Sequence, residues 1–445
     1  MGEEPALATR TELGAAAVEL LARLIQIDTS NPPGREQPVQ ELLRDMLAGA
    51  GFECELVGVE PERPNLVARL RGDAEGPTLC LLGHADTVPA EASEWSRDPW
   101  CGDVVDGEVW GRGALDMKGQ VAAEVSAAAS LASSGWRPAR GELLVVVTAD
   151  EEMGAAYGAK WLCEQRPDLV RSDFVVNEGG GVALGADGRR LYTTALGEKG
   201  VFRLTVRTRG RAGHGSLPRI GDNALLKLGP LLERLRSQPD YEPTPEGVEF
   251  LSAMLGEPIE GTHDSIAAAI ERLAAADPAA AAFIAEPIVS VTMSPTMARA
   301  SEKENVIPST AELFVDCRVP PGHGEDYVRE RVESLLGDGD YEIEFSSRIV
   351  GNSSEAGTDL WRAIADWVAA VDPGAELVPM VMPGFSDSHW FRKAFGAIVY
   401  GFCPHNAMTL AELAPLIHSA DERVAVSDLE LSARFFAELP ARLLG

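Results

Sequence analysis

Residues 78–89, TLCLLGHADTVP, set the frame for the rest of the chain. The apolar run at 79–82 predicts a strand that is buried on both faces, as in a parallel sheet. This run ends at a glycine, which is followed by His84 and Asp86. Open α/β sheets bind ligands just beyond the carboxyl ends of their strands, so His84 and Asp86 are candidates for chemistry at that edge.

Two later apolar runs also end in acidic residues. Residues 141–150, GELLVVVTAD, are followed by Glu151 and Glu152, and residues 173–177, DFVVN, are followed by Glu178. The pattern of the first strand therefore recurs, with carboxylates in place of the imidazole. We expect these side chains to gather at one rim of the sheet.

A glycine-rich loop supplies one more carboxylate. Asp116 lies in GRGALDMKG, just before an Ala-rich stretch that favours a helix. Several carboxylates in one crevice would repel each other and take up protons unless a cation neutralises them. A pair of zinc ions would do so, because zinc accepts both carboxylate oxygen and imidazole nitrogen. A second imidazole would balance the set, and His418, in IHSADERV, is the best candidate.

With these residues the sequence resembles the co-catalytic zinc hydrolases that include aminoacylase, glutamate carboxypeptidase, carboxypeptidase S and succinyl-diaminopimelate desuccinylase. The resemblance covers nearly the whole chain and follows the family's order. Each of its segments alone would be a weak signal, whereas the ordered set is specific. The segments are IDTSNPPGRE, HADTVP, DGEVWGRGALDMKG, TADEEMG, NEGGG, GRAGHGSLP, NVIP, FVDCRVPPG, PGFSDS and HSADERV.

The resemblance implies how the rim residues share the metal ions. Two zinc ions are expected in each subunit, and cobalt or manganese are possible substitutes. The implied ligands are His84 and Glu178 for one ion, Glu152 and His418 for the other, and Asp116 as the bridge between them.

The predicted reaction is the hydrolysis of an amide bond by a water molecule that bridges the two ions. The resemblance makes Glu151 the general base, which takes a proton from the water and hands it to the leaving nitrogen. Asp86 resembles the carboxylate that orients His84 through its remaining ring nitrogen. Two alternatives stay open: a zinc aminopeptidase or dipeptidase, and a non-catalytic metal-binding scaffold, which would need no base.

Three further positions match residues of the family that contact or line the substrate pocket: Asn305 in NVIP, Arg318 in DCRVPP and Gly384 in PGFSDS. A guanidinium group can hold a carboxylate through two hydrogen bonds. We therefore expect a small-molecule substrate with a free carboxylate next to the scissile amide, such as an N-acyl amino acid or a peptide C-terminus. The alternative for Arg318 is a strand arginine that pairs with Asp316 or Glu312.

His214, in GRAGHGSLP, resembles a donor to the oxyanion of the tetrahedral intermediate. In many relatives the inserted domains pair edge to edge, and this histidine enters the partner's active site. We therefore expect a homodimer in which His214 acts in trans. The alternative is a monomer in which the long connection at residues 239–286 takes the place of a partner and His214 acts in cis.

The patterns predict an α/β fold in which a small domain interrupts a larger one. Residues 1–196 and 349–445 are expected to form the catalytic domain, a mixed sheet flanked by helices, in which an extended run at 64–70 pairs with the strand at 78–82. Residues 197–348 are expected to form a ferredoxin-like lid or dimerisation domain with the order β-α-β-β-α-β. Its expected strands are 201–207, 287–293, 311–319 and 341–347, and its helices 223–236 and 325–336.

Bulk properties narrow the class of protein. A chain of 445 residues is expected to form at least two domains. The formal charge of −30 argues against nucleic acid and anionic membranes as partners. The start MGEEPALATR has no basic region before an apolar core, and the six cysteines are scattered, so a cytoplasmic protein with reduced thiols is expected.

Motifs of other enzyme classes are absent from the sequence. There is no HExxH, no GxSxG and no Walker loop, and Gly111-Arg112-Gly113 is followed by Asp116 where a dinucleotide fingerprint needs its third glycine. Four other histidines have no supporting context and are expected to be structural or surface residues: His263, His323, His389 and His405.

Overall fold

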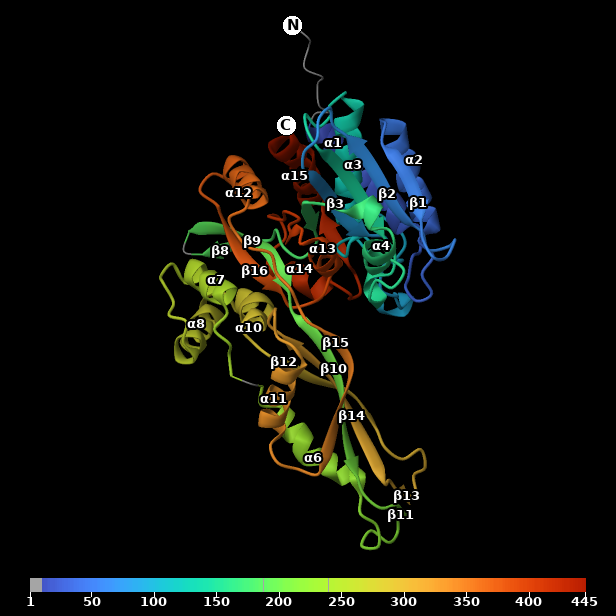
Figure 1. Ribbon diagram of the computed structural model, residues 1–445, viewed down its shortest axis with the longest axis vertical. Helices are drawn as coiled ribbons and strands as arrows, with labels where there is room; N and C mark the ends of the chain where they lie inside the picture. The colour runs from blue at the N-terminus through green and yellow to red at the C-terminus, as the bar shows by residue number, and fades with distance from the viewer. Residues whose placement is uncertain (1–9, 187, 239) are drawn as a thin grey trace. The chain divides into compact units, whose positions relative to one another are not determined.

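The computed structural model describes residues 10–186, 188–238 and 240–445 (Figure 1). Its described residues form two units. The first runs to Gly197 and includes Ser353–Met380 and Ser386–Gly445, and the second contains Glu198–Asn352 and Val381–Phe385. Residues 1–9, on which the expectation of a cytoplasmic protein partly depends, lie outside the described residues.

A nine-stranded mixed sheet has the strand order β1-β2-β6-β3-β7-β17-β9-β16, and β8 pairs with β9. The central strands β6, β3, β7 and β17 are parallel, whereas β1, β2 and β6 pair in antiparallel fashion. The strands are β1 (Glu53–Val57), β2 (Asn65–Arg71), β3 (Thr78–His84), β6 (Glu142–Thr148), β7 (Phe174–Asn177), β8 (Ala183–Ala186), β9 (Arg189–Glu198), β16 (Glu376–Met382) and β17 (Ile398–Gly401).

One predicted strand pairing is wrong. The run at residues 64–70 corresponds to β2, which pairs with β1 and β6 rather than with β3. Strand β6 lies between β2 and β3 and is parallel to β3, because helix α3 (Lys118–Ser133) carries the chain from one parallel strand to the next. The short connection from β2 to β3 along the chain therefore does not make them neighbours in the sheet.

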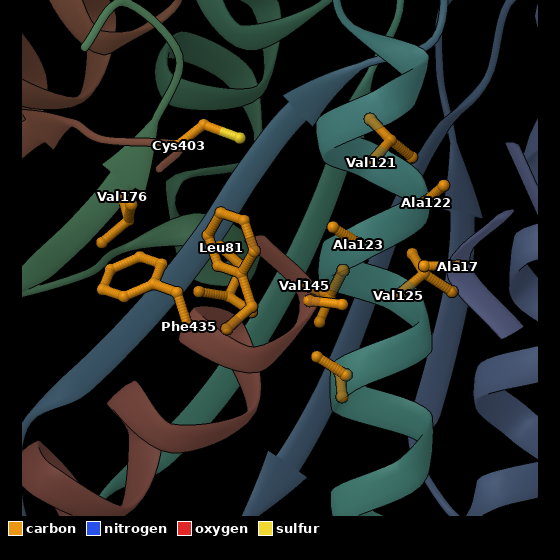
Figure 2. Packing of buried hydrophobic residues seen from close by; sticks show 14 of the residues in the cluster. Ala17, Leu81, Val121, Ala122, Ala123, Val125, Val145, Val176, Cys403 and Phe435 are labelled. Carbon is orange, nitrogen blue, oxygen red and sulfur yellow. The ribbon is translucent and has the colours of Figure 1, made fainter. Parts of the chain in front are cut away.

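Three helices pack against one another in the first unit: α1 (Arg10–Ile25), α3 and α15 (Val426–Leu444). Helix α3 is buried along most of its length, and alanines such as Ala122 and Ala123 allow its close packing. Figure 2 shows these alanines near Val121 and Val125 in a hydrophobic cluster that also holds Phe435 of α15. This buried layer fixes the strand whose end carries His84. Further helices of this unit are α2 (Gln37–Ala50), α4 (Ala159–Gln165), α5 (Pro167–Val170), α12 (Asp359–Val371), α13 (Ser388–Phe395) and α14 (Leu410–Leu413).

The second unit contains a four-stranded sheet in the order β12-β14-β10-β15, with antiparallel pairing throughout. Along β14 buried and half-buried residues alternate, because only one face packs on the helices. Along the chain the order is β10 (Gly200–Arg209), α6 (Ala224–Leu235), β12 (Thr292–Arg299), β14 (Thr310–Val319), α11 (Glu325–Leu336) and β15 (Tyr341–Ile349), labelled in Figure 1.

The strand expected at residues 287–293 is largely wrong. A short helix, α10 (Glu286–Ile288), occupies its start, and β12 begins only at Thr292. A short apolar run does not by itself distinguish a strand from a buried helical turn, and Pro287 favours the first turn of a helix. The long connection before it, apart from residue 239, holds α7 (Pro245–Leu255), α8 (His263–Ala276) and α9 (Pro278–Ala280).

All six cysteines are free thiols. Within the described ranges, no helix combines the length and the apolar character needed to cross a bilayer.

Candidate metal centre

Three neighbouring parallel strands of the first unit deliver the predicted residues. His84 is the last residue of β3, Glu151 and Glu152 lie in a 3₁₀ turn just after β6, and Glu178 directly follows β7. Because β6, β3 and β7 are adjacent and parallel, their carboxyl ends lie at the same edge of the sheet. The expected gathering of these side chains is therefore a consequence of strand order.

Asp116 lies between two imidazole rings. Its Oδ1 is 3.1 Å from Nε2 of His84, and its Oδ2 is 3.0 Å from Nε2 of His418. His418 Nε2 is also 3.3 Å from Glu152 Oε2, and His84 Nε2 is 3.9 Å from Glu178 Oε1. The two oxygens of one carboxylate thus face two separate groups of possible ligands.

Two sets of side chains have ligand atoms close enough to share one metal ion. In each set the atoms lie within 4.8 Å of one another. One set is His84, Glu151 and Glu178, and the other is His84, Asp116 and Glu152. Imidazole nitrogen and carboxylate oxygen are donors that zinc accepts, so these residues fit the metal that the resemblance implies. His418 belongs to neither set, and among the described residues His84 is the histidine that both sets contain.

Two carboxylates of this cluster, those of Glu151 and Glu178, retain their protons unusually well. Burial and the nearby Glu178 carboxylate raise the pKa of Glu151 well above its ordinary value. Burial and Asp116 raise the pKa of Glu178 to about 8. Repulsion of this kind is relieved when a cation binds, so the electrostatics of the cluster favour a metal site.

The two histidines are held in their charged form by the same acids. Burial lowers the pKa of His84, but Asp116 and Glu178 outweigh that effect and raise it well above the ordinary value. Asp116 and Glu152 raise the pKa of His418 to about 10. Burial tends to raise the pKa of Asp116, but His418 and His84 bring it below its ordinary value. A metal ion would therefore compete with protons for these ligands.

Asp86 is buried and contacts three predicted site residues. Its Oδ1 accepts a hydrogen bond from the backbone N–H of Glu151, and its Oδ2 from that of Glu152, each at 3.2 Å. The ring nitrogen Nδ1 of His84 lies 2.9 Å from the carbonyl oxygen of Asp86 and 3.6 Å from its carboxylate. The carbonyl is thus the nearer partner of His84, and the carboxylate holds the turn after β6.

Asn31 is a site residue that the sequence patterns did not single out. Its side-chain amide donates to Asp86 Oδ2 at 2.9 Å and to Asp150 Oδ1 at 3.0 Å. Arg63 pairs with the same Asp150 oxygen at 3.0 Å and with Glu36 at 2.7 Å. These buried groups hold the turn that carries the acids after β6. Asn31 lies within IDTSNPPGRE, but nothing local in that segment shows that it reaches Asp86.

Two more buried carboxylates were missed. Asp387 Oδ2 accepts a hydrogen bond of 2.6 Å from Thr148 Oγ1, and burial raises the pKa of Asp387 to about 7. Glu422 accepts hydrogen bonds from the loop that carries Asp116. Asp387 belongs to PGFSDS and Glu422 to HSADERV, so both were within segments that carry the resemblance.

A cavity of about 370 Å³ lies beside His418 in the first unit. The side chain of His418 is 49% exposed, whereas that of His84 is 1% exposed, so the His418 side of the cluster is open to a ligand. The cavity is lined by Pro89, Ala90, Glu91, Glu94, Trp95, Arg112, His418, Ser419 and Ala420.

The other predicted residues belong to the second unit. His214 lies in β11 (Gly213–His214), which pairs with β13 (Val306–Ile307). The backbone N–H of Gly215 donates to the carbonyl of Asn305 at 2.8 Å, so His214 and Asn305 are near each other. The backbone N–H of Ser216 donates to Nδ1 of His214 at 3.2 Å.

Arg318 has an intramolecular partner. Its Nε donates to Asp316 Oδ1 at 2.6 Å, which is the pairing considered as the alternative to substrate binding. A Cβ atom added at Gly384 would meet only the Met382 side chain, at 3.8 Å or more, so local packing does not require glycine there.

Comparison with known proteins identifies the family. Residues 80–442 match the sequence model of Peptidase family M20/M25/M40. A succinyl-diaminopimelate desuccinylase of Cereibacter sphaeroides is 26% identical over 427 residues, which is 93% of this chain and 95% of that protein. Thus the predicted resemblance is confirmed.

Solved structures agree in fold. The M20 family metallo-carboxypeptidase Sso-CP2 of Sulfolobus solfataricus has a TM-score of 0.73 at 17% identity and covers 96% of this chain and 99% of its own. Human carnosine dipeptidase 1 has a TM-score of 0.68 at 17% identity and covers 99% of this chain and 100% of its own. The predicted α/β fold with a mixed sheet flanked by helices is confirmed. The family match spans most of the chain, and the chain therefore belongs to peptidase family M20/M25/M40 and is a metal-dependent hydrolase.

Proposed function

We propose that this protein hydrolyses an amide bond next to a free carboxylate in a small molecule, such as an N-acyl amino acid or the C-terminal bond of a short peptide. The observation that carries the proposal is Asp116, whose two oxygens lie 3.1 and 3.0 Å from the imidazoles of His84 and His418. A carboxylate in this position suits a bridge between two metal ions.

The assignment of residues to the two metal ions is the one that the resemblance implies, and the distances between the side chains support it. His84 and Glu178 would hold one zinc ion, Glu152 and His418 the other, and Asp116 would bridge them; cobalt or manganese are possible substitutes. When bound, the metal pair supplies Lewis acidity and lowers the pKa of the attacking water.

Glu151 is proposed as the general base. Its backbone N–H donates to Asp86 Oδ1 at 3.2 Å, and this bond holds the turn that carries the Glu151 side chain. The carboxylate would accept a proton from the water and return it to the leaving nitrogen. In the metal-free protein, burial and the nearby Glu178 raise the pKa of Glu151 well above its ordinary value.

Substrate preference is proposed to depend on the second unit. Arg318 would bind the substrate carboxylate, with Asn305 and Gly384 near the substrate. In the free protein Asp316 pairs with the Arg318 guanidinium, so the substrate carboxylate would have to displace or share that partner. The pairing with Asp316 gives the Arg318 guanidinium a defined orientation before the substrate binds.

An N-acyl amino acid is expected to be hydrolysed about 10-fold or more faster than its C-terminal carboxamide, because a hydrogen bond to a charged group contributes about 1.5–3 kcal/mol. Values of kcat/KM for the two compounds measure this preference, and Arg318→Ala should abolish it. Arg203→Ala is the matched control, because Arg203 also faces Asp316, at 3.5 Å. Equal rates for the acid and the carboxamide in the wild-type protein would contradict the proposal.

The same assay separates the alternatives. A zinc aminopeptidase or dipeptidase would prefer peptides with a free amine to N-acylated compounds. A non-catalytic scaffold would hydrolyse neither in the presence of added zinc. Hydrolysis of the acylated substrates alone supports the deacylase or carboxypeptidase activity.

We further propose that residues 197–348 form an inserted lid and dimerisation domain between the catalytic parts 1–196 and 349–445. His214 would act as the oxyanion donor in the active site of a partner chain. Nδ1 of His214 lies 2.8 Å from Ser216 Oγ and 3.2 Å from the backbone nitrogen of Ser216, and Nε2 would be the donor to the oxyanion. A cytoplasmic location is proposed on the free thiols of all six cysteines.

His214→Ala is expected to lower kcat by roughly 10² to 10³, the usual effect of losing an oxyanion donor. Mixing this variant with Glu151→Gln under exchange should restore up to about a quarter of the wild-type rate in a shared-site dimer, because half of the dimers are hybrids with one complete site each. Each variant mixed with itself is the control. No recovery despite proven exchange, or a solution mass of one chain, would favour a monomer with His214 in cis.

A further inference from the structure

The carboxylate of Glu422 is buried in the first unit and accepts four hydrogen bonds. Oε2 accepts from Arg112 Nη1 at 2.6 Å and from the backbone N–H of Gly113 at 3.1 Å. Oε1 accepts from the backbone N–H groups of Leu115 at 2.7 Å and Asp116 at 3.1 Å. A carboxylate offers about four acceptor sites, so this one is fully used on a single loop.

These hydrogen bonds join two segments that are far apart in the sequence. Glu422 and Asp116 are separated by 306 residues. Next to them, β18 (Arg423–Ala425) pairs with β5 (Glu108–Trp110), and β5 in turn pairs with β4 (Val104–Val105). The backbone N–H of Gly111 also donates to the Glu422 carbonyl at 2.9 Å. The loop is therefore bonded to the segment that carries His418 both at its start, through Gly111, and at its end, through Asp116.

The backbone between His418 and Glu422 is held in an uncommon conformation. His418 and Asp421 both have φ of 59°, in the left-handed region that costs free energy for residues other than glycine. The backbone N–H of Ser96 donates to Asp421 Oδ1 at 2.7 Å. Asp421 and Glu422 thus anchor the turn that presents His418.

We propose that Glu422 is a positioning residue of the metal centre. Its side chain binds the loop that carries Asp116, and Glu422 itself belongs to the turn that carries His418. It therefore fixes how closely Asp116 approaches His418. The 3.0 Å separation of Asp116 Oδ2 and His418 Nε2 is the distance that this bond network sets. The inference rests on the proposed function for the metal, but its structural part concerns only residues of this chain.

A purely structural ion pair with Arg112 accounts for one of the four hydrogen bonds. The other three come from backbone amides of the loop that ends at Asp116, including the amide of Asp116 itself. Groups around a site that orient its metal ligands commonly affect metal affinity by about 10- to 100-fold. Glu422 is therefore expected to affect the ligand geometry and not the folding free energy alone.

The test is Glu422→Gln, which keeps the shape but places an amide NH₂ where one carboxylate oxygen was. That NH₂ must face either Arg112 and Gly113 or Leu115 and Asp116, and all of these are donors, so one pair of hydrogen bonds is lost. Glu124→Gln is the matched control, because Glu124 is also buried in the first unit, and burial raises its pKa to about 8.

The first measurement is hydrogen exchange of the peptide containing residues 111–117 in metal-free protein. Faster exchange in Glu422→Gln, but not in Glu124→Gln, is expected. The second is zinc titration, with cobalt absorption as the spectroscopic signature. Binding of one of two equivalents should weaken by about 10- to 100-fold with an altered cobalt spectrum. If Glu422→Gln does not fold, Glu422→Asp, whose shorter side chain keeps the charge but moves the carboxylate away from the loop amides, is measured for the same two signals.

The outcomes separate the two proposals. Unchanged exchange, or a wild-type cobalt spectrum and zinc affinity in the folded variant, would overturn the positioning role while leaving the hydrolase proposal intact. Wild-type protein that binds fewer than two zinc ions would overturn the two-metal proposal and this inference with it.

Discussion

Glu151→Gln is expected to lower kcat by at least about 10²-fold while the zinc content stays unchanged. Glutamine keeps the size and the polar character of the side chain but has no site that accepts the proton of the attacking water. The backbone N–H of residue 151 would still donate to Asp86, because that bond does not involve the side chain. The turn after β6 should therefore keep its position.

Two measurements on the same sample check this expectation: kcat for an N-acyl amino acid, and bound zinc by elemental analysis. Glu164→Gln is the control, since Glu164 lies on the exposed side of α4 in the same region of the sheet. A near-wild-type rate would reject Glu151 as the base. A loss of zinc together with the loss of rate would assign Glu151 to the ligands, as its proximity to His84 and Glu178 allows.

The strands that carry most of the candidate metal ligands could be predicted because each strand is encoded locally. An apolar run of strand length followed by His84, by Glu151 and Glu152 or by Glu178 marks both the strand and its functional end. The structure places these strands side by side and in parallel, which brings their ends together. The pattern therefore predicted the strands and the candidate residues at their ends, whereas the role of each residue stays a prediction.

The supporting residues could not be predicted in the same way. Asn31 reaches Asp86 across 55 residues, and Glu422 reaches Asp116 across 306. Their roles depend on hydrogen bonds that exist only after distant segments have packed, and a buried asparagine or glutamate has no distinct local pattern. The wrong pairing of β2 with β3 has the same origin, since sheet order depends on which strands the crossover helices bring together.

The pH behaviour of the metal-free protein follows from the protons that its cluster holds. Glu178 has a pKa of about 8 in the folded state, raised by burial and Asp116, against about 4.5 when unfolded. His418 has a pKa of about 10, raised by Asp116 and Glu152, against about 6.5. Both folded-state values lie above the unfolded ones, so the folded state binds more protons, and its stability falls as pH rises through this window.

Removal of the metal ions by a chelator is expected to abolish hydrolysis and to lower the midpoint temperature of unfolding. The difference in this midpoint between metal-loaded and metal-free protein should widen from about pH 5.5 to pH 8.5. The cations replace protons on the histidines and acids, so loaded protein escapes the loss of stability that affects the metal-free form. At a free zinc concentration 100 times Kd, a single site adds about 2.7 kcal/mol to the free energy of unfolding.

Thermal unfolding at several pH values, with and without zinc, measures the difference in midpoint. Magnesium, which prefers oxygen ligands, is the control ion. A midpoint that does not respond to the chelator, or a difference that narrows as pH rises, would show that protons and metal do not compete for His84, Asp116 and His418.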